Sequence, residues 1–381
     1  MLYYIFMKVV SISTDRKLFE EGSVVLTRQK YYAERMEELH VIVFSLSKNG
    51  YKYRSFGNLH LYPMNSSSRI SFLFDAYRLG KKIILENSFK KENSVITTQD
   101  SFETGLVGYL LKKKFNLPLQ LQIHTDFLNS YFKNSSLNLA RVVLAKFLIP
   151  KADGLRVVSS VISGSLQKEF PNLKTKIDIL PIFIDIEKIK NSAISINLRQ
   201  KYPDRFIILM ASRVTKEKNI ILAIKLVSSL IRANKRIVLL IVGDGPEKKT
   251  LQLYAKDMGG YVVFEPWTLD LTSYYKTADV FLLTSQYEGY GMTLIEAGAS
   301  GCPIVTTNVG IAKTDLFKNG ENAFVCPVGD VDCLSKAIID LIENPEKRKL
   351  FKERMQDSIK RVTVSKEEYV YRYVAMLENL L

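Results

Sequence analysis

The sequence predicts an α/β protein made of two doubly wound domains, each with a mostly parallel sheet covered by helices. The length of 381 residues exceeds the roughly 100–200 residues of a typical domain. Short apolar or β-branched runs alternate with longer amphipathic stretches, as expected for parallel sheets covered by helices. The series of strands also restarts at Phe206, after a polar stretch without periodicity.

The first half of the chain contains seven predicted strands separated by helices. These strands are Lys8–Ser13, His40–Ser45, Leu59–Pro63, Ser94–Thr97, Gln120–His124, Gly154–Val158 and Lys176–Leu180. The helices lie near Val25–Met36, Ser71–Leu79, Thr104–Lys114 and Asn138–Leu148. We expect residues 1–190 to form the first domain.

A second series of strands follows a polar segment. The predicted strands are Phe206–Ser212, Ile237–Gly243, Tyr261–Glu265, Val280–Thr284 and Pro303–Thr307. Asn219–Ala233 has apolar residues at helical spacing, which predicts a helix. The preceding residues 186–204 are polar and end in Tyr202-Pro203-Asp204, so we expect the linker there. Residues 191–362 then form the second domain.

The end of the chain is predicted to be helical, with a break near Val362–Ser365 where Thr363 or Ser365 starts a new helix. The last helix, within residues 363–381, carries an apolar stripe of Tyr371, Val374 and Leu377. Such a stripe must be buried, and docking on the first domain is one possibility.

The charge of the chain is concentrated in its first half. The formal net charge is +15, and residues 1–190 contain 28 basic and 17 acidic side chains. An excess of this kind attracts nucleic acid, anionic lipid or phosphorylated substrates. The sequence lacks a helix-turn-helix, zinc-finger or RNP pattern, so we expect no nucleic-acid partner.

Several cations of the first half are interleaved with apolar residues. They are Arg78, Lys81, Lys82, Lys90, Lys91 and Lys112–Lys114, near Leu79, Ile83, Ile84, Phe89 and Leu110–Leu111. This mixture suits peripheral contact with an anionic membrane surface, and solvated helix faces explain it equally well.

The cysteines and the opening residues bear on location. Cys302, Cys326 and Cys333 form an odd set without a CxxC pair, which argues against disulfides or a zinc site and favours a reducing compartment. The apolar opening, Met1 to Ile12, is interrupted by Lys8, lacks a basic start and is too short to cross a bilayer. We expect neither a signal peptide nor a membrane span, and a cytoplasmic protein.

The segment from Glu288 to Glu296 is the most informative, because it joins a buried strand to an apolar helix. Gly289 and Gly291 let the backbone approach a ligand, and the helix start offers N–H groups to phosphate oxygens. Glu296 is placed to accept hydrogen bonds from vicinal hydroxyls. The alternative reading is a favourable charge near a helix N-terminus. The candidate binding residues here are Gly289, Tyr290, Gly291, Met292, Thr293, Leu294 and Glu296.

Two further loops follow predicted strands of the second domain. Arg213 and Lys218 lie five positions apart, and a planar guanidinium with a point charge suits a diphosphate, although a solvated loop remains an alternative. Gly243 and Gly245 are expected to shape a tight turn at the nucleotide side. Position 248 is Lys, so this loop is not a GxGxxG dinucleotide fingerprint.

The first domain offers weaker candidates. Gly22 precedes a predicted helix, where backbone N–H groups meet a phosphate or sugar, or where a plain cap is formed. His124 ends a predicted strand and is followed by Asp126, whereas a lone histidine is often a structural hydrogen-bonding group. His40 and His60 are assigned to that structural role.

Two acidic patterns resemble metal ligands. Asp185-Ile-Glu187 and Asp330-Val-Asp332 invite that interpretation, but Asp330 precedes an amphipathic helix, where Asp usually caps. We therefore expect no bound metal and no cofactor.

With these residues identified, the chain resembles the retaining glycosyltransferases of GT-B fold, glycosyltransferase family 4. The E-x7-E signature falls on Glu288 and Glu296, and the Arg-x4-Lys pair on Arg213 and Lys218. The match is strong from Arg205 to about Ile342 and weaker before that. Tyr290 stands where Phe is common, and Glu265-Pro266-Trp267 replaces a frequent glycine near the expected base pocket, which leaves the base open.

The resemblance implies two Rossmann-like domains facing a central cleft, with the acceptor on the first and the nucleotide-sugar donor on the second. By that resemblance Arg213 and Lys218 hold the diphosphate, Glu296 the ribose and Glu288 the transferred sugar. Gly22 and His124 approach the donor sugar from the first domain, with Asp126 on the acceptor side. The leaving diphosphate is stabilised without a metal.

The expected reaction is sugar transfer to a hydroxyl of a glycan or lipid-linked acceptor, at the inner face of the cytoplasmic membrane or in the cytoplasm. A nucleotide-sugar epimerase of GT-B fold and a catalytically silent nucleotide-sugar binder are the alternatives.

Overall fold

The computed structural model describes residues 5–233 and 236–381, and the chain separates into two compact units. The first unit contains Met1–Pro181 and Ser365–Leu381, and the second contains Ile182–Val364. Residues 1–4 of the apolar opening lie outside the described residues. None of the helices in the described part is long and apolar enough to cross a membrane.

The first unit is built on an eight-stranded sheet of order β3-β4-β2-β1-β5-β6-β7-β8. All neighbours pair in parallel except β3 with β4. The strands are β1 (Ile5–Ser13), β2 (Met36–Val43), β3 (Arg54–Phe56), β4 (Leu59–Pro63), β5 (Ser94–Thr98), β6 (Leu119–Ile123), β7 (Gly154–Val157) and β8 (Lys176–Ile179). The chain turns outward in both directions from β1, so the carboxyl ends of β1 and β5 border a switch point where ligands bind in open α/β sheets.

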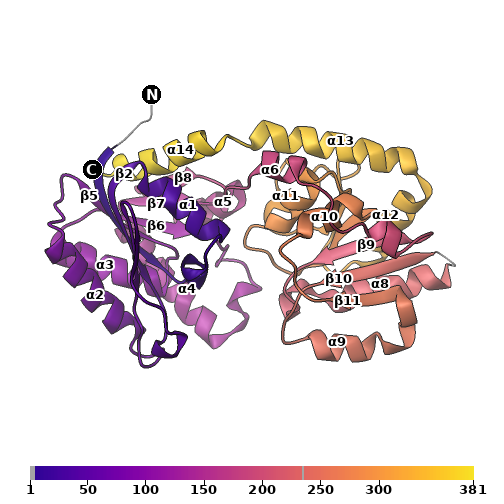
Figure 1. The fold of residues 1–381 in the computed structure, drawn as a ribbon, viewed down its shortest axis with the longest axis horizontal. Coiled ribbons are helices and arrows are strands. Elements are labelled where there is room, and N and C mark those ends of the chain that lie inside the picture. Colours follow the sequence, from indigo (N-terminus) through magenta and orange to yellow (C-terminus); the bar gives the residue numbers. More distant parts are fainter. Residues whose placement is uncertain (1–4, 234–235) are drawn as a thin grey trace. The chain divides into compact units, whose positions relative to one another are not determined.

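Helices cover both faces of this sheet. They are α1 (Val24–Ala33), α2 (Phe72–Glu86), α3 (Glu103–Phe115), α4 (Ser136–Leu148), α5 (Ser160–Glu169) and α14 (Lys366–Glu378). Right-handed crossovers put α1 on the face opposite to α2, α3 and α4, and α14 packs beside α1 (Figure 1). Tyr32 of α1 stacks on Tyr373 of α14 with 4.0 Å between ring centroids. The end of the chain thus completes the first unit. Val374 and Leu377 are fully buried there, whereas Tyr371, expected in the same stripe, is 46% exposed because it lies on the outer face of α14.

The second unit is built on a six-stranded parallel sheet of order β11-β10-β9-β12-β13-β14. Its strands are β9 (Phe206–Ala211), β10 (Ile237–Val242), β11 (Val262–Glu265), β12 (Val280–Leu283), β13 (Ile304–Thr307) and β14 (Phe324–Cys326). The switch point lies between β9 and β12, because the chain proceeds from β9 to one edge and from β12 to the other.

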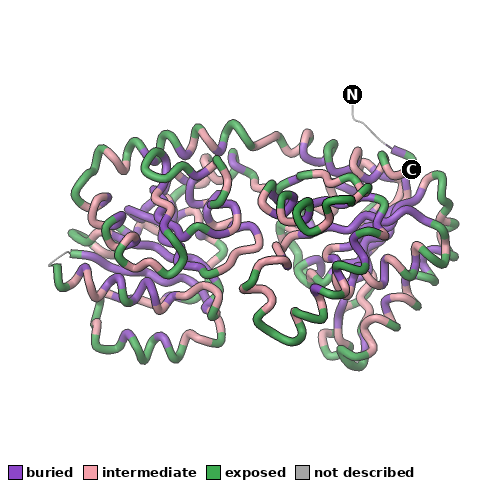
Figure 2. Tube along the Cα trace, turned by 180° about the vertical axis from the view of Figure 1, so that it is seen from behind, coloured by how far each residue is buried: buried purple, intermediate pink, exposed green. Residues whose placement is uncertain are grey.

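The helices of the second unit bury the sheet on both faces. They are α6 (Ile186–Asn191), α7 (Leu198–Lys201), α8 (Ile220–Arg232), α9 (Lys248–Tyr254), α10 (Leu271–Thr277), α11 (Met292–Ala299), α12 (Val331–Glu343) and α13 (Pro345–Val362). The apolar faces of α8 and α12 form one core with β9, β10 and β12. Figure 2 shows the strands of both units buried over most of their length and the helices exposed on their outer faces.

The expectation of two doubly wound α/β domains is confirmed, and most predicted elements lie within a few residues of the observed ones. The exception among the connections is the expected linker at 186–204, which folds into the second unit. Leu198 is fully buried, and its N–H donates to Thr277 Oγ1 at 3.2 Å. Side chains of α10 accept hydrogen bonds from the backbone of this polar segment. The segment is therefore packed into the second unit, although its sequence lacks periodicity.

The expectation of unpaired cysteines is wrong for two of the three. Cys326 and Cys333 form a disulfide with 5.8 Å between their Cα atoms, whereas Cys302 is free and buried. The turn that follows β14 brings the first turns of α12 back beside the strand end. Pairing therefore depended on a local turn and not on a CxxC spacing.

Candidate active site

The loops that follow β9 and β12 are tied together at the switch point of the second unit. The Thr284 hydroxyl donates to the backbone oxygens of Lys218 and Asn219, both at 3.0 Å. The Gln286 N–H donates to the Glu217 backbone oxygen at 2.8 Å. These bonds bring two separate sequence motifs to one edge of the sheet.

Lys218 and Glu288 form the central ion pair of this site. Lys218 Nζ donates to Glu288 Oε1 at 2.6 Å, and the two side chains are only 13% and 10% exposed. Ser285 Oγ donates to the same Oε1 at 2.7 Å. The Ser285 backbone oxygen in turn accepts from Thr307 Oγ1 of β13 at 2.6 Å. Glu288 is therefore held by groups from two strand ends.

Arg213 lies in the same loop as Lys218 but is exposed. Its Nη2 donates to Glu217 Oε1 at 3.2 Å, and 76% of the Arg213 side chain is open to solvent. A largely exposed guanidinium held by one carboxylate is free to exchange that partner for an anion. The loop thus offers a largely buried cation, Lys218, and an exposed one, Arg213.

The glycines after β10 bring a third loop against the first. A Cβ on Gly243 would lie 2.0 Å from the Ser212 backbone oxygen, and one on Gly245 would lie 2.2 Å from that of Val214. Val214 N–H also donates to the Asp244 backbone oxygen at 2.8 Å. The two glycines therefore allow the close approach of two backbone segments beside Arg213.

The turn into α11 contains Gly291 and is supported by a second glycine, Gly310, which was not among the candidates from the sequence. Gly291 has a φ of +102° and precedes the helix. Gly310 has a φ of +53°, and a Cβ there would lie 2.5 Å from the Tyr290 backbone oxygen and 2.8 Å from Glu288 Cβ. Ile311 N–H donates to that same Tyr290 oxygen at 2.7 Å. The segment after β13 therefore supports the Glu288–Gly291 turn.

The first turn of α11 presents backbone donors. Its N-terminal N–H groups, including those of Met292 and Thr293, have no partner within the helix. The Leu294 side chain is fully buried, and its N–H donates to the Gly291 oxygen at 3.0 Å. Gly289 is half-buried in the turn. This end of the helix has the N–H groups and dipole that favour an anion.

Glu296 lies in the second turn of α11, where its carboxylate is half-buried. Tyr275 of α10 donates its hydroxyl to Glu296 Oε2 at 3.3 Å. Burial raises the pKa of Glu296, and the hydrogen bond from Tyr275 opposes that shift only in part. Burial of Tyr275 also raises the pKa of its own hydroxyl. Tyr275 therefore remains a donor that orients Glu296.

Glu265, which stands where a glycine was expected, is a structural anchor. It is 8% exposed, accepts from Tyr274 OH at 2.5 Å and pairs with Lys201. Burial alone would raise the pKa of Glu265, but the bonds from Lys201 and Tyr274 hold it below its ordinary value. This carboxylate ties α7 and α10 to the end of β11.

Three candidates lie in the first unit. Gly22 has a φ of +74° in an exposed turn, and the adjacent Ser23 caps α1 by accepting from Leu26 N–H at 3.1 Å. Asp126 accepts from Ser165 Oγ at 3.1 Å and Leu128 N–H at 3.3 Å. His124 follows β6 directly, half-buried, with its Nε2 3.2 Å from Gln122 Oε1. These candidates lie in a different compact unit from the second-unit candidates.

The two acidic patterns are helix caps. Asp330 accepts from Cys333 N–H at 2.9 Å at the start of α12, and Asp185 accepts from Lys188 N–H at 2.9 Å at the start of α6. Among the described residues, no group of three or more His, Cys, Asp or Glu side chains is placed to hold a metal ion.

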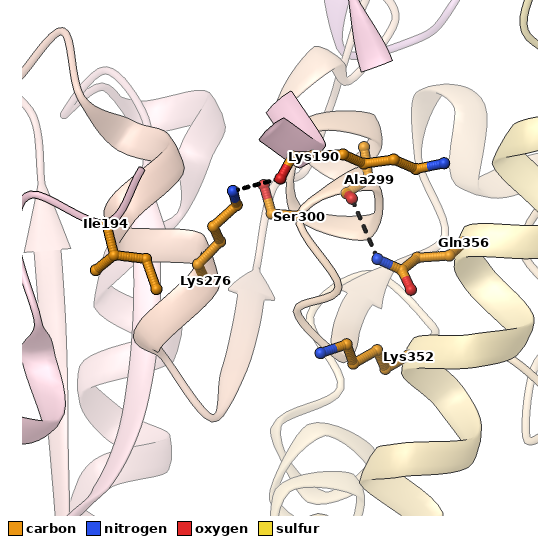
Figure 3. A pocket seen from close by; sticks show the side chains of 7 residues that line it. All are labelled: Lys190, Ile194, Lys276, Ala299, Ser300, Lys352 and Gln356. Carbon is orange, nitrogen blue, oxygen red and sulfur yellow. Dashed lines mark hydrogen bonds between the residues drawn. The ribbon is translucent and has the colours of Figure 1, made fainter. Parts of the chain in front are cut away.

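A pocket of about 340 Å³ lies at the opposite end of α11 from this site (Figure 3). Its lining residues are Lys190, Ile194, Lys276, Ala299, Ser300, Lys352 and Gln356. Lys276 Nζ already donates to the backbone oxygens of Lys190 and Ser192, at 2.8 and 2.6 Å. The carbonyl end of a helix disfavours anions, so the geometry sets this pocket apart from the sheet edge that carries Arg213 and Lys218.

Comparison with known proteins agrees with this geometry. Residues 194–358 match the family described as glycosyl transferases group 1, and this range contains Arg213, Lys218, Glu288 and Glu296. The second unit thus carries the segment that matches group 1 of the glycosyl transferases. The fold of the whole chain matches sucrose-phosphate synthase from Thermosynechococcus elongatus with a TM-score of 0.81, at 16% identity over 98% of this chain and 99% of that one. The chain therefore has the GT-B fold, as expected.

Two curated relatives cover most of the chain. N-acetyl-alpha-D-glucosaminyl L-malate synthase of Bacillus anthracis is 24% identical over 346 residues, which are 87% of this chain and 86% of that protein. UDP-Gal:alpha-D-GlcNAc-diphosphoundecaprenol alpha-1,3-galactosyltransferase of Escherichia coli is 25% identical over 271 residues, 69% and 70% of the two chains. The chain is thus similar in sequence to sugar transferases over most of its length.

Proposed function

We propose that this protein is a retaining, metal-independent glycosyltransferase of family 4 that moves a sugar from a nucleotide-sugar donor to a hydroxyl acceptor. The observation that carries this proposal is the Lys218–Glu288 ion pair at 2.6 Å, beside Arg213 and the N-terminus of α11. Two cations and a helix N-terminus at one sheet edge suit a leaving diphosphate, on which negative charge grows as the glycosyl bond breaks.

Each side chain has a role in the proposed reaction. Arg213 and Lys218 bind the donor diphosphate, Glu296 accepts from the ribose hydroxyls, and Glu288 accepts from a hydroxyl of the transferred sugar. Charge stabilisation comes from these side chains, so the proposed mechanism uses no metal and no cofactor. Gly22, His124 and Asp126 of the first unit serve the donor sugar and the acceptor.

The proposed acceptor is a glycan or a lipid-linked sugar in cell-envelope synthesis. The name of the Escherichia coli relative includes a diphosphoundecaprenol-linked sugar and a UDP donor. We propose a cytoplasmic enzyme that contacts the inner face of the membrane.

One helix face of the first unit supports the membrane contact. In α4, Leu139, Val143 and Phe147 recur at helical spacing and are 50%, 70% and 48% exposed. Lys146 and Lys151 lie on or next to that helix. Exposed apolar residues flanked by lysines suit an anionic lipid surface. In a flotation assay with phosphatidylglycerol vesicles, Val143→Glu should reduce binding, whereas Leu253→Glu, at a 74% exposed site of α9, should not.

The first test of the activity is a thermal-shift screen of the whole protein with UDP, GDP and ADP and their sugars. A ligand at 100 times its Kd stabilises the folded state by about 2.7 kcal/mol, so the correct base should stand out. UDP is the first candidate because the name of the Escherichia coli relative contains UDP-Gal. Binding should survive EDTA, and dependence on added metal would overturn metal independence.

The second test separates transfer from the alternatives. With the identified donor alone, slow release of free nucleoside diphosphate and sugar indicates a transferase. An altered sugar that is still linked to the nucleotide indicates an epimerase. Binding without either change would show a silent binder. NMR of the anomeric proton of the first product then tests retention of configuration.

A further inference from the structure

A buried hydrogen-bond chain in the first unit links His124 to Arg156 through Gln122. Gln122 Oε1 lies 2.6 Å from Arg156 Nη1 and 3.2 Å from His124 Nε2. All three residues lie on or directly after the neighbouring strands β6 and β7. Neither Gln122 nor Arg156 was among the candidates that the sequence suggested.

The hydrogen-bond chain fixes the orientation of the Gln122 amide. A guanidinium only donates hydrogen bonds, so the Gln122 atom that faces Arg156 is the carbonyl oxygen. The amide nitrogen then donates to Thr97 Oγ1 at 3.0 Å and to Tyr373 OH at 3.2 Å. The Thr97 hydroxyl donates to Gln120 Oε1 at 3.1 Å, which leaves its lone pairs for Gln122. The donors and acceptors are therefore mutually consistent.

The fixed amide decides which nitrogen of His124 carries the proton. Because Gln122 offers an acceptor to Nε2, that nitrogen must donate. A neutral imidazole carries one proton, so Nδ1 is left as the acceptor. Within the described part of the chain, Gln122 is the hydrogen-bond partner recorded for His124, so no protein donor is seen at Nδ1.

Arg156 also opposes a second proton on His124. It is 4% exposed and has no carboxylate within ion-pair distance among the described residues. Its Nη2 donates to Tyr369 OH at 2.8 Å and to the Leu180 oxygen at 3.3 Å, and its guanidinium lies 5.4 Å from the centre of the Tyr373 ring. Burial first, and then the charges of Arg156 and Arg28, lower the pKa of His124 to about 3.

We infer that Gln122 and Arg156 are positioning residues that hold His124 as the neutral Nε2–H tautomer, with Nδ1 ready to accept from a hydroxyl of the transferred sugar. The tautomer follows from the hydrogen bonds of the first unit alone. The hydroxyl as the ligand of Nδ1 rests on the proposed function. Tyr369 and Tyr373 make α14 the support of this arrangement.

The tautomer is measured directly by NMR on the full chain labelled with ¹⁵N-histidine. The chain has three histidines, and the resonances lost in His124→Gln identify those of His124. We expect a protonated Nε2 and an unprotonated Nδ1 from pH 5 to pH 8. A protonated Nδ1, or an imidazolium within that range, would overturn the inference.

A matched pair of variants tests whether Gln122 sets this state. Gln122→Met removes the acceptor, so the Nε2–H preference should be lost and transfer should fall about tenfold or more. Gln120→Met changes the same residue type on the same buried strand and removes only the acceptor of the Thr97 hydroxyl. Gln122 still meets Arg156 and His124 in that variant, so the tautomer should be kept. An equal loss of the tautomer in both variants would show a general core effect and reject the inference.

A second variant decides the question if Gln122→Met does not fold. Gln122→Glu keeps the side-chain size and puts a carboxylate beside Nε2, which favours imidazolium. The His124 titration should then move upward from about 3, and an unmoved titration counts against the inference. If the wild-type tautomer is as expected but His124→Gln transfers sugar normally, the proposed role of His124 in sugar binding is wrong. The inference that Gln122 and Arg156 set the His124 tautomer is then still supported.

Discussion

Lys218 and Glu288 lie 70 positions apart in the chain, and their side chains meet at 2.6 Å. Each comes from a loop that follows one of two adjacent parallel strands, β9 and β12. The Thr284 hydroxyl fixes the distance between those loops by bonding to the backbone of the first. The pair is therefore built into the sheet edge.

Replacing Lys218 tests the charge at this edge. Lys218→Met removes the fixed cation, and we expect transfer to fall about 100-fold or more, since a preorganised group that stabilises developing charge has an effect of that size. The measurement is release of nucleoside diphosphate at saturating donor and acceptor. Lys216→Met is the control, because Lys216 is exposed in the same loop. Equal losses in both variants would contradict a specific role for Lys218.

Replacing Arg213 should lower the affinity for the nucleoside diphosphate while leaving the stability of the fold almost unchanged. It is 76% exposed and pairs with one carboxylate, so Arg213→Ala should change the free energy of unfolding by no more than about 0.5 kcal/mol. Affinity for the nucleoside diphosphate should nevertheless fall, because the guanidinium fork is lost. Arg213→Lys should restore part of the affinity through its charge. Urea unfolding and calorimetric titration give the two quantities, and unchanged affinity in Arg213→Ala would exclude Arg213 from the donor site.

The sequence predicted these residues because each motif directly follows a buried strand. The run Phe206–Ala211 is apolar throughout, so the position of Arg213 at a sheet edge followed from the pattern. Tyr275 and Arg156 gave no such signal. Tyr275 is distant in sequence from Glu296, which it contacts, and Arg156 is distant from His124, to which it is linked through Gln122. Arg156 lies within a strand, and the sequence pattern would predict that a cation there is exposed. It is buried because Tyr369 of α14 packs against it and accepts a hydrogen bond from its guanidinium.

Features of the fold that depend on contacts between distant segments were also missed by the sequence-based prediction. β14 has three residues, too few for a periodic pattern, and the residues expected as a linker have partners on α10. The disulfide depended on a turn whose geometry the spacing of Cys326 and Cys333 did not reveal. Long buried runs were predictable because their hydrophobicity is local, whereas these features arise from contacts with other segments.

Gly310 is expected to support the Glu288–Gly291 turn through its lack of a side chain. Gly310→Ala would bring a Cβ to 2.5 Å from the Tyr290 oxygen and 2.8 Å from Glu288 Cβ. Gly320→Ala is the matched control, because Gly320 also has a positive φ but has no atom within 4 Å of the added Cβ. Both variants carry backbone strain, and only Gly310→Ala should also displace Glu288. We expect a larger drop in Tm and in transfer for Gly310→Ala; equal effects would show that backbone strain alone matters.

His124 should make the folded state sensitive to acid. Its pKa is about 3 in the folded protein against 6.5 for the ordinary group, so between these values the unfolded chain binds the extra proton. Stability from neutral His124 is therefore present above about pH 6.5 and is lost as the pH falls toward 3, by at most about 1.4 kcal/mol per pH unit and less for a half-buried ring. Urea midpoints at pH 7 and pH 4.5 measure this loss. In His124→Gln the difference between the two midpoints should shrink, because that side chain does not titrate. A variant that loses as much stability in acid as the wild type would show that other groups cause the effect.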